Sequence, residues 1–512
     1  MTSRENSAVH AGVSVVGDAS HEAPSSSNAS TTVDVEKATA AAAAPGDKND
    51  DTNPNQHGLE WHGPDDAANP LNWPVHKKAM QVIGVALVTL LSNLAATMFA
   101  PGAAQLMPEF GFDSTNIASL TVSIYLLGYA VAPSLWAPLS ETYGRLPVYA
   151  ITALVYCGFT LGCAFATDLG MFMAFRVLAG AAGSCPTALC GGTLADIFVE
   201  KERGRWMGLF VLGPLAGPVV GPIAGGFIAE AVGWRWVFRV LLIAYAFVAI
   251  LCIAFLRETY GPVILRRRAG VSAHRAERNA QPGNWLRSLK HVMRPLSIVL
   301  CSPMVWFLSL YAAFTFGLQF ILFTTFPEVF EGQYGFSVGI SGLAYLGLGI
   351  GMFAAVMIHD VFAERLVRSR AAARRSGGNV PEDRLPLMAY LSWTLPAGMF
   401  WYGWSVEYRV HWIVPILGTV LIGAGSVFIM MPQMVYLVQS FGAEAGASAI
   451  AVNMIVRYIA GAFLPLAGPP MYEKLGYGWG NSLLGFLGIA FMPLPWALVK
   501  YGEKVRSWNR TL

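Results

Sequence analysis

Charged side chains are scarce in this 512-residue chain: Asp, Glu, Lys and Arg make up 13% of it, and hydrophobic residues 54%. Soluble domains carry about 25% charged residues, so the composition excludes a series of water-soluble domains. Residues 1–78 contain no long apolar run, but long uncharged stretches follow Lys78. Because about 20 apolar residues span a bilayer, we expect an all-α membrane protein that crosses the lipid bilayer many times.

Twelve such stretches are present, six on each side of a polar loop. The first six are Ala79–Pro108, Ile117–Leu139, Pro147–Thr167, Leu169–Ala195, Trp206–Ala229 and Trp236–Leu256. The second six are Pro303–Pro327, Phe336–Ile358, Leu385–Val406, Val410–Ala443, Ala445–Tyr472 and Leu475–Val499. Two repeated halves of this kind are common in secondary transporters. The pattern therefore predicts twelve transmembrane helices arranged as two six-helix halves.

The expected organisation has five parts. Residues 1–78 form a disordered N-terminal tail, because the first 60 are rich in Ser, Ala, Asp and Asn. The first six-helix half covers 79–256 and the second covers 303–499. The loop 257–302 connects the halves, and 500–512 form a short tail.

Lysine and arginine gather in the segments that a cytoplasmic N-terminus would place inside the cell. The loop Arg257–Pro303 contains nine of them, the loop Asp360–Arg384 six and the tail after Val499 four. The opposite loops contain only Arg235, Arg409 and Lys474. Positive charge favours the cytoplasmic side, so both termini are predicted to be cytoplasmic. These basic loops need no nucleic-acid partner to explain them.

Motifs for enzymatic or ATP-driven chemistry are missing. The chain has no GxxxxGK[ST] phosphate loop, no HExxH pair and no Gly-x-Ser-x-Gly turn. Its six cysteines lie in or beside apolar stretches and form no CxxC pair, so neither a metal site nor a cofactor is expected. The sequence thus predicts a protein that is not an enzyme.

The turn between the second and third stretches combines an acid, a glycine and a base. Glu141, Gly144 and Arg145 follow one another at this predicted cytoplasmic turn. Gly144 permits a tight turn, and the two charged side chains can reach helix ends and each other. We interpret the turn as a conformational latch; the alternative is an ordinary charged loop.

Arg176 lies about two turns inside an otherwise apolar stretch. A charge at that depth is costly, by ~2.5–3.5 kcal/mol or more, so it should face a polar cavity or a partner. The alternative is that the side chain extends to the nearer, outer interface. Asp196 follows the same stretch and is, with Glu141, a candidate for proton coupling.

Glycine and proline repeat every four residues in the fifth stretch. The repeat contains Gly213, Pro214, Gly217, Pro218, Gly221, Pro222, Gly225 and Gly226. Steps of four drift only ~40° on a helix, so the glycines form one flat stripe that permits close helix packing. We assign a gating role to this stripe; the alternative is close packing alone.

Polar and aromatic residues inside the stretches predict a substrate cavity between the halves. Asn453 and Arg457 are four apart and so share one helix face. The full set is Asn93, Tyr125, Tyr129, Arg176, Gln319, Gln433, Tyr436, Asn453 and Arg457. Singly, each is more often a helix-packing contact. Together they predict a cavity with aromatic walls and few charges, suited to a bulky apolar or amphipathic ligand.

Carboxylates are missing from the interiors of the stretches, where the only charged residues are Arg176, Arg239 and Arg457. An ordinary proton-coupled carrier uses a buried carboxylate whose pKa is raised. The residue that couples transport to protons is therefore sought at helix ends, at Asp196 and Glu141.

Taken in order, these motifs resemble those of the major facilitator superfamily, and in particular its fungal twelve-span drug:proton antiporters. The match runs from about Asn69 to the C-terminus. The quoted marks are Asn69–Pro74, Pro138–Glu141, Gly191–Asp196, Gly217–Gly226, Gly233–Trp236, Glu258–Leu265 and Ser448–Asn453. The departures are Ala137 where Gly is usual, Glu141 where Asp is usual, and Gln439 where an acid is expected.

The resemblance implies a monomeric plasma-membrane exporter of a hydrophobic drug or fungal secondary metabolite, driven by inward proton flow. A polyketide toxin such as cercosporin, exported for self-resistance, is the implied cargo. Its halves would rock about a central site. The alternatives are a nutrient or polyamine carrier of the same fold and a non-transporting membrane sensor.

Overall fold

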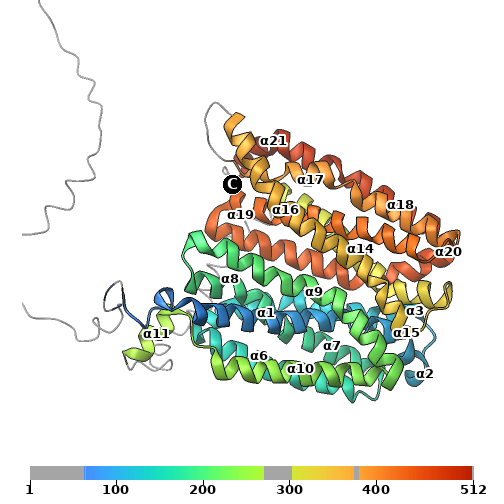
Figure 1. Ribbon diagram of the computed structural model, residues 1–512, viewed down its shortest axis with the longest axis horizontal. Helices are drawn as coiled ribbons and strands as arrows, with labels where there is room; N and C mark the ends of the chain where they lie inside the picture. The colour runs from blue at the N-terminus through green and yellow to red at the C-terminus, as the bar shows by residue number, and fades with distance from the viewer. Residues whose placement is uncertain (1–60, 62, 64, 270–301, 374–379, 510–512) are drawn as a thin grey trace, which may run out of the picture. The chain divides into compact units, whose positions relative to one another are not determined.

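The computed structural model describes residues 61, 63, 65–269, 302–373 and 380–509, and these contain helices but no strand. The predicted disordered tail 1–78 lies outside this part of the chain up to residue 60, but its last part contains a short helix at Pro70–Asn72 and the start of the first long helix at Val75. Most of the central loop also lies outside the described residues. Figure 1 shows the first half in blue to green and the second half in yellow to red, packed side by side.

Helices of the first half follow its six predicted stretches, several of them in pieces. The long ones are α1 (Val75–Thr97), α6 (Arg145–Ala164), α9 (Glu200–Val232) and α10 (Trp234–Phe255). The second stretch forms α3 (Thr115–Ser123), α4 (Tyr125–Val131) and α5 (Pro133–Tyr143), and the fourth forms α7 (Leu169–Gly183) and α8 (Cys185–Ile197). Short elements are η1 (Pro70–Asn72), η2 (Ala100–Gln105), α2 (Leu106–Phe110) and α11 (Gly261–Arg268).

The second half repeats the plan. Its long helices are α14 (Pro303–Gly332), α16 (Tyr345–Ala373), α19 (Ile413–Phe463), α20 (Gly468–Phe491) and α21 (Pro493–Asn509). The shorter ones are α15 (Val338–Leu343), α17 (Pro386–Leu391), α18 (Thr394–Glu407), η3 (Pro381–Arg384) and η4 (Leu464–Ala467).

Two glycines break the helical backbone at span boundaries, one in α19 and one in α20. Gly442 has φ 74° and ψ −171° within α19, and Gly476 has φ 73° and ψ 173° within α20. Glycine adopts such left-handed backbone angles without the penalty that a Cβ brings. The first break separates the tenth and eleventh predicted spans, and the second separates the eleventh and twelfth.

By length and apolar content, nine helices of the described residues can cross a membrane, or ten with the bent α3–α5 segment. One of the nine, Ser448–Lys504, contains the break at Gly476 and so holds two spans. The ninth predicted span is split between α17 and α18, each too short to be counted alone. All twelve predicted stretches are therefore helical, and the predicted fold class is confirmed.

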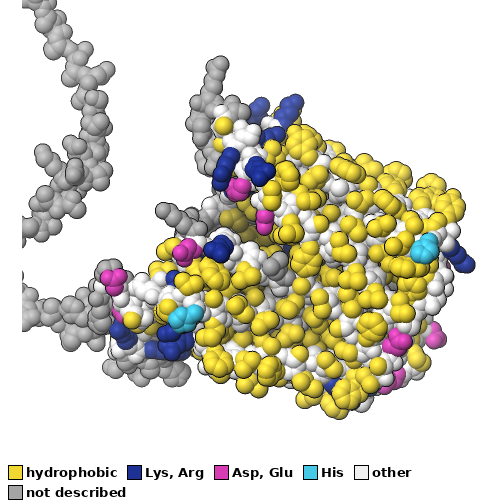
Figure 2. Space-filling view, in the orientation of Figure 1, with side chains coloured by type: hydrophobic (Ala, Val, Ile, Leu, Met, Phe, Trp, Pro, Cys, Tyr) yellow, Lys and Arg dark blue, Asp and Glu magenta, His cyan; other side chains and the backbone are white. Residues whose placement is uncertain are grey.

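Apolar side chains cover the sides of the bundle and charged ones gather at its two ends (Figure 2). Leu154 and Met357 are 70% and 72% exposed, which a water-soluble protein would avoid at so many positions. Lipid contact accounts for this surface, since hydrocarbon solvates such side chains as well as a protein core does.

The two ends of the bundle differ in how the halves meet. One end, which we call the terminal end, contains the start of α1 and the end of α21. At the other, which we call the closed end, η2, α3 and the last turns of α9 contact α14, α15 and η4. In Figure 1 the closed end lies at the right, where the labels α3 and α15 stand.

Candidate functional site

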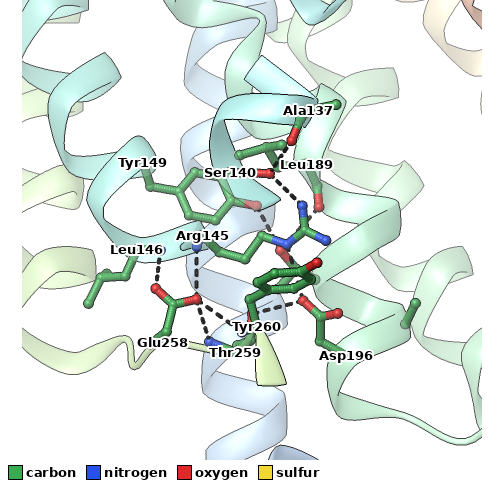
Figure 3. A network of polar contacts seen from close by, with 12 residues as sticks. Ala137, Ser140, Arg145, Leu146, Tyr149, Leu189, Asp196, Glu258, Thr259 and Tyr260 are labelled. Carbon is green, nitrogen blue, oxygen red and sulfur yellow. Dashed lines mark hydrogen bonds and ion pairs between the residues drawn. The ribbon is translucent and has the colours of Figure 1, made fainter. Parts of the chain in front are cut away.

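A carboxylate from beyond α10 holds the start of α6 at the terminal end (Figure 3). The Oε1 of Glu258 accepts the backbone N–H of Arg145 at 2.8 Å, and its Oε2 accepts that of Leu146 at 3.1 Å. These N–H groups begin a helix and have no helical partner, and the helix dipole favours a negative charge there. Gly144 precedes them with φ 101°, and a Cβ at this position would collide with the Glu258 carboxylate. The tight turn therefore requires glycine for two independent reasons.

The side chain of Arg145 joins the pieces of this turn. Its Nε lies 3.1 Å from the Oδ2 of Asp196 at the end of α8, and its Nη1 donates to the Oγ of Ser140 at 2.5 Å. Its guanidinium lies 5.1 Å from the ring centre of Tyr260. The hydroxyl of Thr259 donates to the same Asp196 oxygen at 3.3 Å. Helices α5, α6 and α8 and the segment after α10 are thus bound through one buried guanidinium.

The turn contains an ion pair, but not the Glu141–Arg145 pair that the sequence suggested, and its role as a latch stays a prediction. Glu141 is exposed and forms no ion pair among the described residues. Arg145 pairs with Asp196 instead, 51 residues away. Glu258 was not predicted as a site residue, although the run Glu258–Leu265 stood out in the sequence. The sequence feature that could have identified Glu258 was its position, an acid two residues after the last apolar stretch of the first half.

Arg176 is 1% exposed and binds backbone carbonyls of two other helices. Its Nη1 donates to Ala95 O at 3.0 Å, and its Nη2 donates to Val122 O at 2.9 Å and Ala96 O at 3.5 Å; its Nε donates to Thr121 O at 3.2 Å. These carbonyls belong to the last turns of α1 and α3, where no helical N–H follows. A cation at two helix C-termini is also favoured by their dipoles.

This arrangement explains a charge inside the membrane without a cavity or a carboxylate. The guanidinium also lies 4.8 Å from the ring centre of Tyr125 and 5.7 Å from that of Phe238. Arg176 does not extend to an interface, and in this conformation it is closed to solvent. Its contacts make it a tie between helices of the first half, so the predicted place of Arg176 in the substrate cavity finds no support in this geometry.

The glycine stripe of α9 packs against α1. A Cβ added at Gly217 would lie 2.8 Å from Leu94 N, and one at Gly221 would lie 2.9 Å from Leu94 O. One added at Gly225 would collide with the carbonyl oxygen of Met98. The stripe therefore brings the backbones of α1 and α9 into direct contact.

The opposite side of the same segment faces the second half. A Cβ at Gly226 would lie 2.7 Å from Val338 O, and one at Gly342 would lie 2.6 Å from Pro222 O. The Gly-Pro segment is thus packed between α1 on one side and α15 on the other. Any movement between the halves at this end changes the second of these contacts.

Hydrogen bonds also cross between the halves at the closed end. The Oε2 of Glu230, at the end of α9, accepts the N–H of Gly339 at 2.6 Å and the hydroxyl of Ser337 at 2.9 Å. The hydroxyl of Ser123 donates to Ala462 O at 2.7 Å. Glu230 was not among the predicted gating residues.

Two of the predicted cavity residues lie where the halves meet deeper in the bundle. The ring of Tyr129 in α4 lies edge-on to that of Tyr458 in α19, with 5.4 Å between centres. The Tyr129 hydroxyl donates to Gly183 O at 2.9 Å. Arg457, the neighbour of Tyr458, lies 5.1 Å from the ring centre of Phe316 and 4.8 Å from that of Tyr458. We call this aromatic group, Tyr129, Phe316, Arg457 and Tyr458, the seam cluster.

Other predicted cavity residues lie inside one half. The Tyr125 hydroxyl donates to Ser92 O at 2.9 Å, and the Tyr436 hydroxyl contacts the Sδ of Met304 at 3.2 Å. Both tyrosines are almost fully buried. They pack helices of their own half together, and the ring centre of Tyr125 also lies 5.4 Å from that of Tyr129 in the seam cluster.

The predicted polar amides have mixed surroundings. Asn453 donates from Nδ2 to the hydroxyl of Ser309 at 3.3 Å, and Asn93 donates from Nδ2 to Thr89 O at 2.9 Å. The Nε2 of Gln319 and the Oε1 of Gln433 are buried and have no partner in the described part of the chain.

Comparisons with known proteins agree with this architecture. The profile of the Major Facilitator Superfamily matches residues 85–465. The MFS transporter fsa7 of a Fusarium species is 48% identical over 458 residues, which are 88% of this chain and 89% of that protein. A protein of Gibberella fujikuroi, described as the trichosetin biosynthesis cluster MFS transporter, is 45% identical over 467 residues, 90% of each chain.

Solved structures share the fold. The xylose transporter XylE of E. coli, in a partially occluded inward-open conformation, aligns with a TM-score of 0.60 at 17% identity. The alignment covers 82% of this chain and 99% of XylE. The family and the fold expected from the motifs are both confirmed.

Proposed function

Because the chain belongs to the major facilitator superfamily and is a transporter rather than an enzyme, we propose that it exports a hydrophobic secondary metabolite in exchange for protons. The observation that carries the proposal is the 45% identity to a transporter named for the biosynthesis cluster of trichosetin. Transporters placed in such clusters are expected to move the product of the cluster. The aromatic seam cluster supports a bulky, largely apolar cargo over a sugar or a small ion.

We assign the terminal end to the cytoplasm from the Lys and Arg content of its loops. Under this assignment, the contacts between α9 and α15 close the outer side, and the protein is in an inward-facing state. Export then requires the Glu230 and Ser123 contacts to break while the terminal end closes. The Gly-Pro segment, packed on both halves, is suited to transmit this rocking motion.

Proton coupling is proposed at the terminal end, since no carboxylate contacts the seam cluster in the described part of the chain. Asp196 is the leading candidate because its carboxylate is half-buried and shared between Arg145 and Thr259. A proton on Asp196 would weaken its pairing with Arg145 and loosen the turn. Glu141 is a second candidate, being exposed and free to bind elsewhere when the terminal end closes.

The setting of the proposed export is a plasma membrane, where a monomer would carry the compound out of the producing cell and protect it. The cercosporin-type polyketides implied by the motifs and the metabolites of the relatives' clusters are the two groups of cargo to test first.

Transport into inside-out plasma-membrane vesicles from yeast expressing the chain tests the proposal. The vesicles are given an acidic lumen, and uptake of a fluorescent planar polyketide is followed with and without a protonophore. Uptake that requires the acidic lumen supports proton-driven export. Uptake that ignores the gradient contradicts the proton coupling, and no uptake of any tested metabolite, with the protein present in the vesicles, contradicts the export of this class.

A further inference from the structure

Three arginines lie inside the apolar spans, and among the described residues only Arg176 has hydrogen-bond partners, whereas the Nε atoms of Arg239 and Arg457 are both buried without one. Arg176 donates to four backbone carbonyls. Arg239 lies near the closed end, beside the ring of Phe165 at the exposed end of α6 and that of Trp236. Arg457 also has no carbonyl partner among the described residues, but it lies where the two halves meet, beside rings of α14 and α19.

The position of Arg457 excludes extension of its side chain to water at either end. It lies 12 residues after the start and 15 residues before the end of the eleventh apolar stretch, Ala445–Tyr472 (457 − 445 and 472 − 457). This stretch is helical on both sides of the short η4, so at about 1.5 Å per residue the separations correspond to about 18 Å and about 22 Å. The guanidinium is therefore near the middle of its span.

Arg457 also lacks a counter-charge. Within the residues that the structure describes, it forms no ion pair and no hydrogen bond, and its Nε is buried without a partner. Arginine does not lose its proton in proteins, so the charge remains. The rings of Phe316 and Tyr458 compensate part of it through cation–π contacts. The rest of the side chain is partly exposed between the halves, where a ligand can reach it.

The surroundings of Arg457 have the composition of a binding site for an organic anion. The guanidinium offers a planar pair of donors suited to a carboxylate. The rings of Phe316 and Tyr458 flank it, and Tyr129 adds a ring from the other half. A charged group thus meets Arg457 while an attached ring system packs on aromatic surfaces.

We propose that the cargo is a hydrophobic acid, carried as its anion, whose acidic group pairs with Arg457 and whose apolar body packs on the seam cluster. The proposal rests on the export function above and names the substrate class for it. It explains why the central cation has no partner in the protein: the partner is the cargo. It also predicts that export of the cargo is favoured by an inside-negative membrane potential, since a negative charge leaves the cell.

A matched pair of probes tests this assignment on the full-length protein in nanodiscs. 1-Pyrenebutyrate and its methyl ester share a planar apolar body and differ in the negative charge. We expect the wild-type protein to bind the acid at least tenfold more tightly than the ester at pH 7.5. The Arg457→Gln variant should lose this preference while binding the ester as before, and Arg457→Lys should keep part of it. Arg239→Gln removes a span arginine away from the seam cluster and should leave both affinities unchanged.

Thermal stability separates a binding role from a structural one. Because Arg457 has no hydrogen-bond or ion-pair partner in the described part of the chain, Arg457→Gln should leave the Tm unchanged or raise it. Equal affinity of the wild type for acid and ester, absence of binding of both probes, or a Tm lowered by several degrees in Arg457→Gln would each overturn the proposal. Charge-selective binding without transport of the acid in proteoliposomes would contradict the export function and leave the anion site in place.

Discussion

The carboxylate of Glu258 accepts the backbone N–H of Arg145 at 2.8 Å, although the two residues are 113 positions apart in the sequence. This contact joins the segment after α10 to the turn between α5 and α6. The same side chain also accepts the N–H groups of Leu146, Thr259 and Tyr260. One carboxylate therefore binds backbone N–H groups of both segments that meet at the terminal end, the start of α6 and the residues after Glu258.

Replacement of Glu258 should weaken this junction. Hydrogen bonds to a charged group contribute about 1.5–3 kcal/mol, so Glu258→Ala is expected to lower the Tm of the purified protein by several degrees. Glu258→Gln keeps one acceptor and should lower it less. Glu141→Gln is the control, because Glu141 is exposed and unpaired in the described structure. Equal Tm values for Glu258→Ala and Glu141→Gln would show that the junction contributes nothing.

Replacement of Arg176 should affect folding before it affects transport. Arg176→Ala leaves four buried carbonyls at the ends of α1 and α3 without donors, and each unsatisfied group costs about 1–3 kcal/mol. We expect a strong loss of folded protein at the cell surface, measured by fluorescence size-exclusion chromatography, and partial recovery with Arg176→Lys. Arg239→Ala, which removes no hydrogen bond, should express normally. If the Arg176→Ala variant were expressed at the wild-type level and were as stable, Arg176 would not be needed to hold the ends of α1 and α3 together.

Adding a single methyl group to α9 should be harmful on the face that packs against α1 and harmless on the face that is open. Gly225→Ala places a Cβ against the Met98 carbonyl and should destabilise the protein and reduce transport strongly. Gly208→Ala lies in the same helix with nothing within 4 Å of the added Cβ. This control should be neutral or stabilising by up to about 1 kcal/mol, because alanine favours helices over glycine. Transport by Gly225→Ala at the wild-type rate would mean that α1 and α9 adjust at no cost.

A reversible cross-link should trap the closed end. Cysteines at Glu230 and Ser337, whose side chains hydrogen-bond across the halves at 2.9 Å, should form a disulfide when oxidised in a cysteine-free background. Transport should then stop, and reduction should restore it. Cysteines at Gln105 and Ala229, which contact each other within the first half, provide the control pair. Continued transport by the oxidised Glu230–Ser337 pair would exclude opening at this end.

Much of the fold was predictable because span length and charge are properties of local sequence. The twelve stretches, the break between the tenth and eleventh spans and the packing stripe all follow from the distribution of apolar residues, glycine and charge. That the tenth and eleventh spans are joined by a single kink at Gly442 was not predicted, since a glycine at a boundary fits a longer loop as well as a kink.

The partners of the charged residues were harder to predict. Arg145 pairs with Asp196 and not with Glu141, because the choice depends on which helix ends the bundle brings together. Arg176 was expected at a cavity, since a sequence does not reveal that two other helices end beside it. Arg457, by contrast, is also an arginine at a similar depth in its span, but it lies in the seam cluster between the halves. Only the contacts in space distinguish the two arginines.

The four hydrogen bonds of Arg176 have a mechanical consequence. The chain is broken where α1 meets η2 and where α3 meets α4, and breaks of this kind act as hinges in many helices. Here a single guanidinium donates hydrogen bonds to the ends of both α1 and α3, so bending at either end would break some of these bonds. In the proposed rocking motion, the first half would therefore move as one rigid body against the second half, with the Gly-Pro segment at the contact between them.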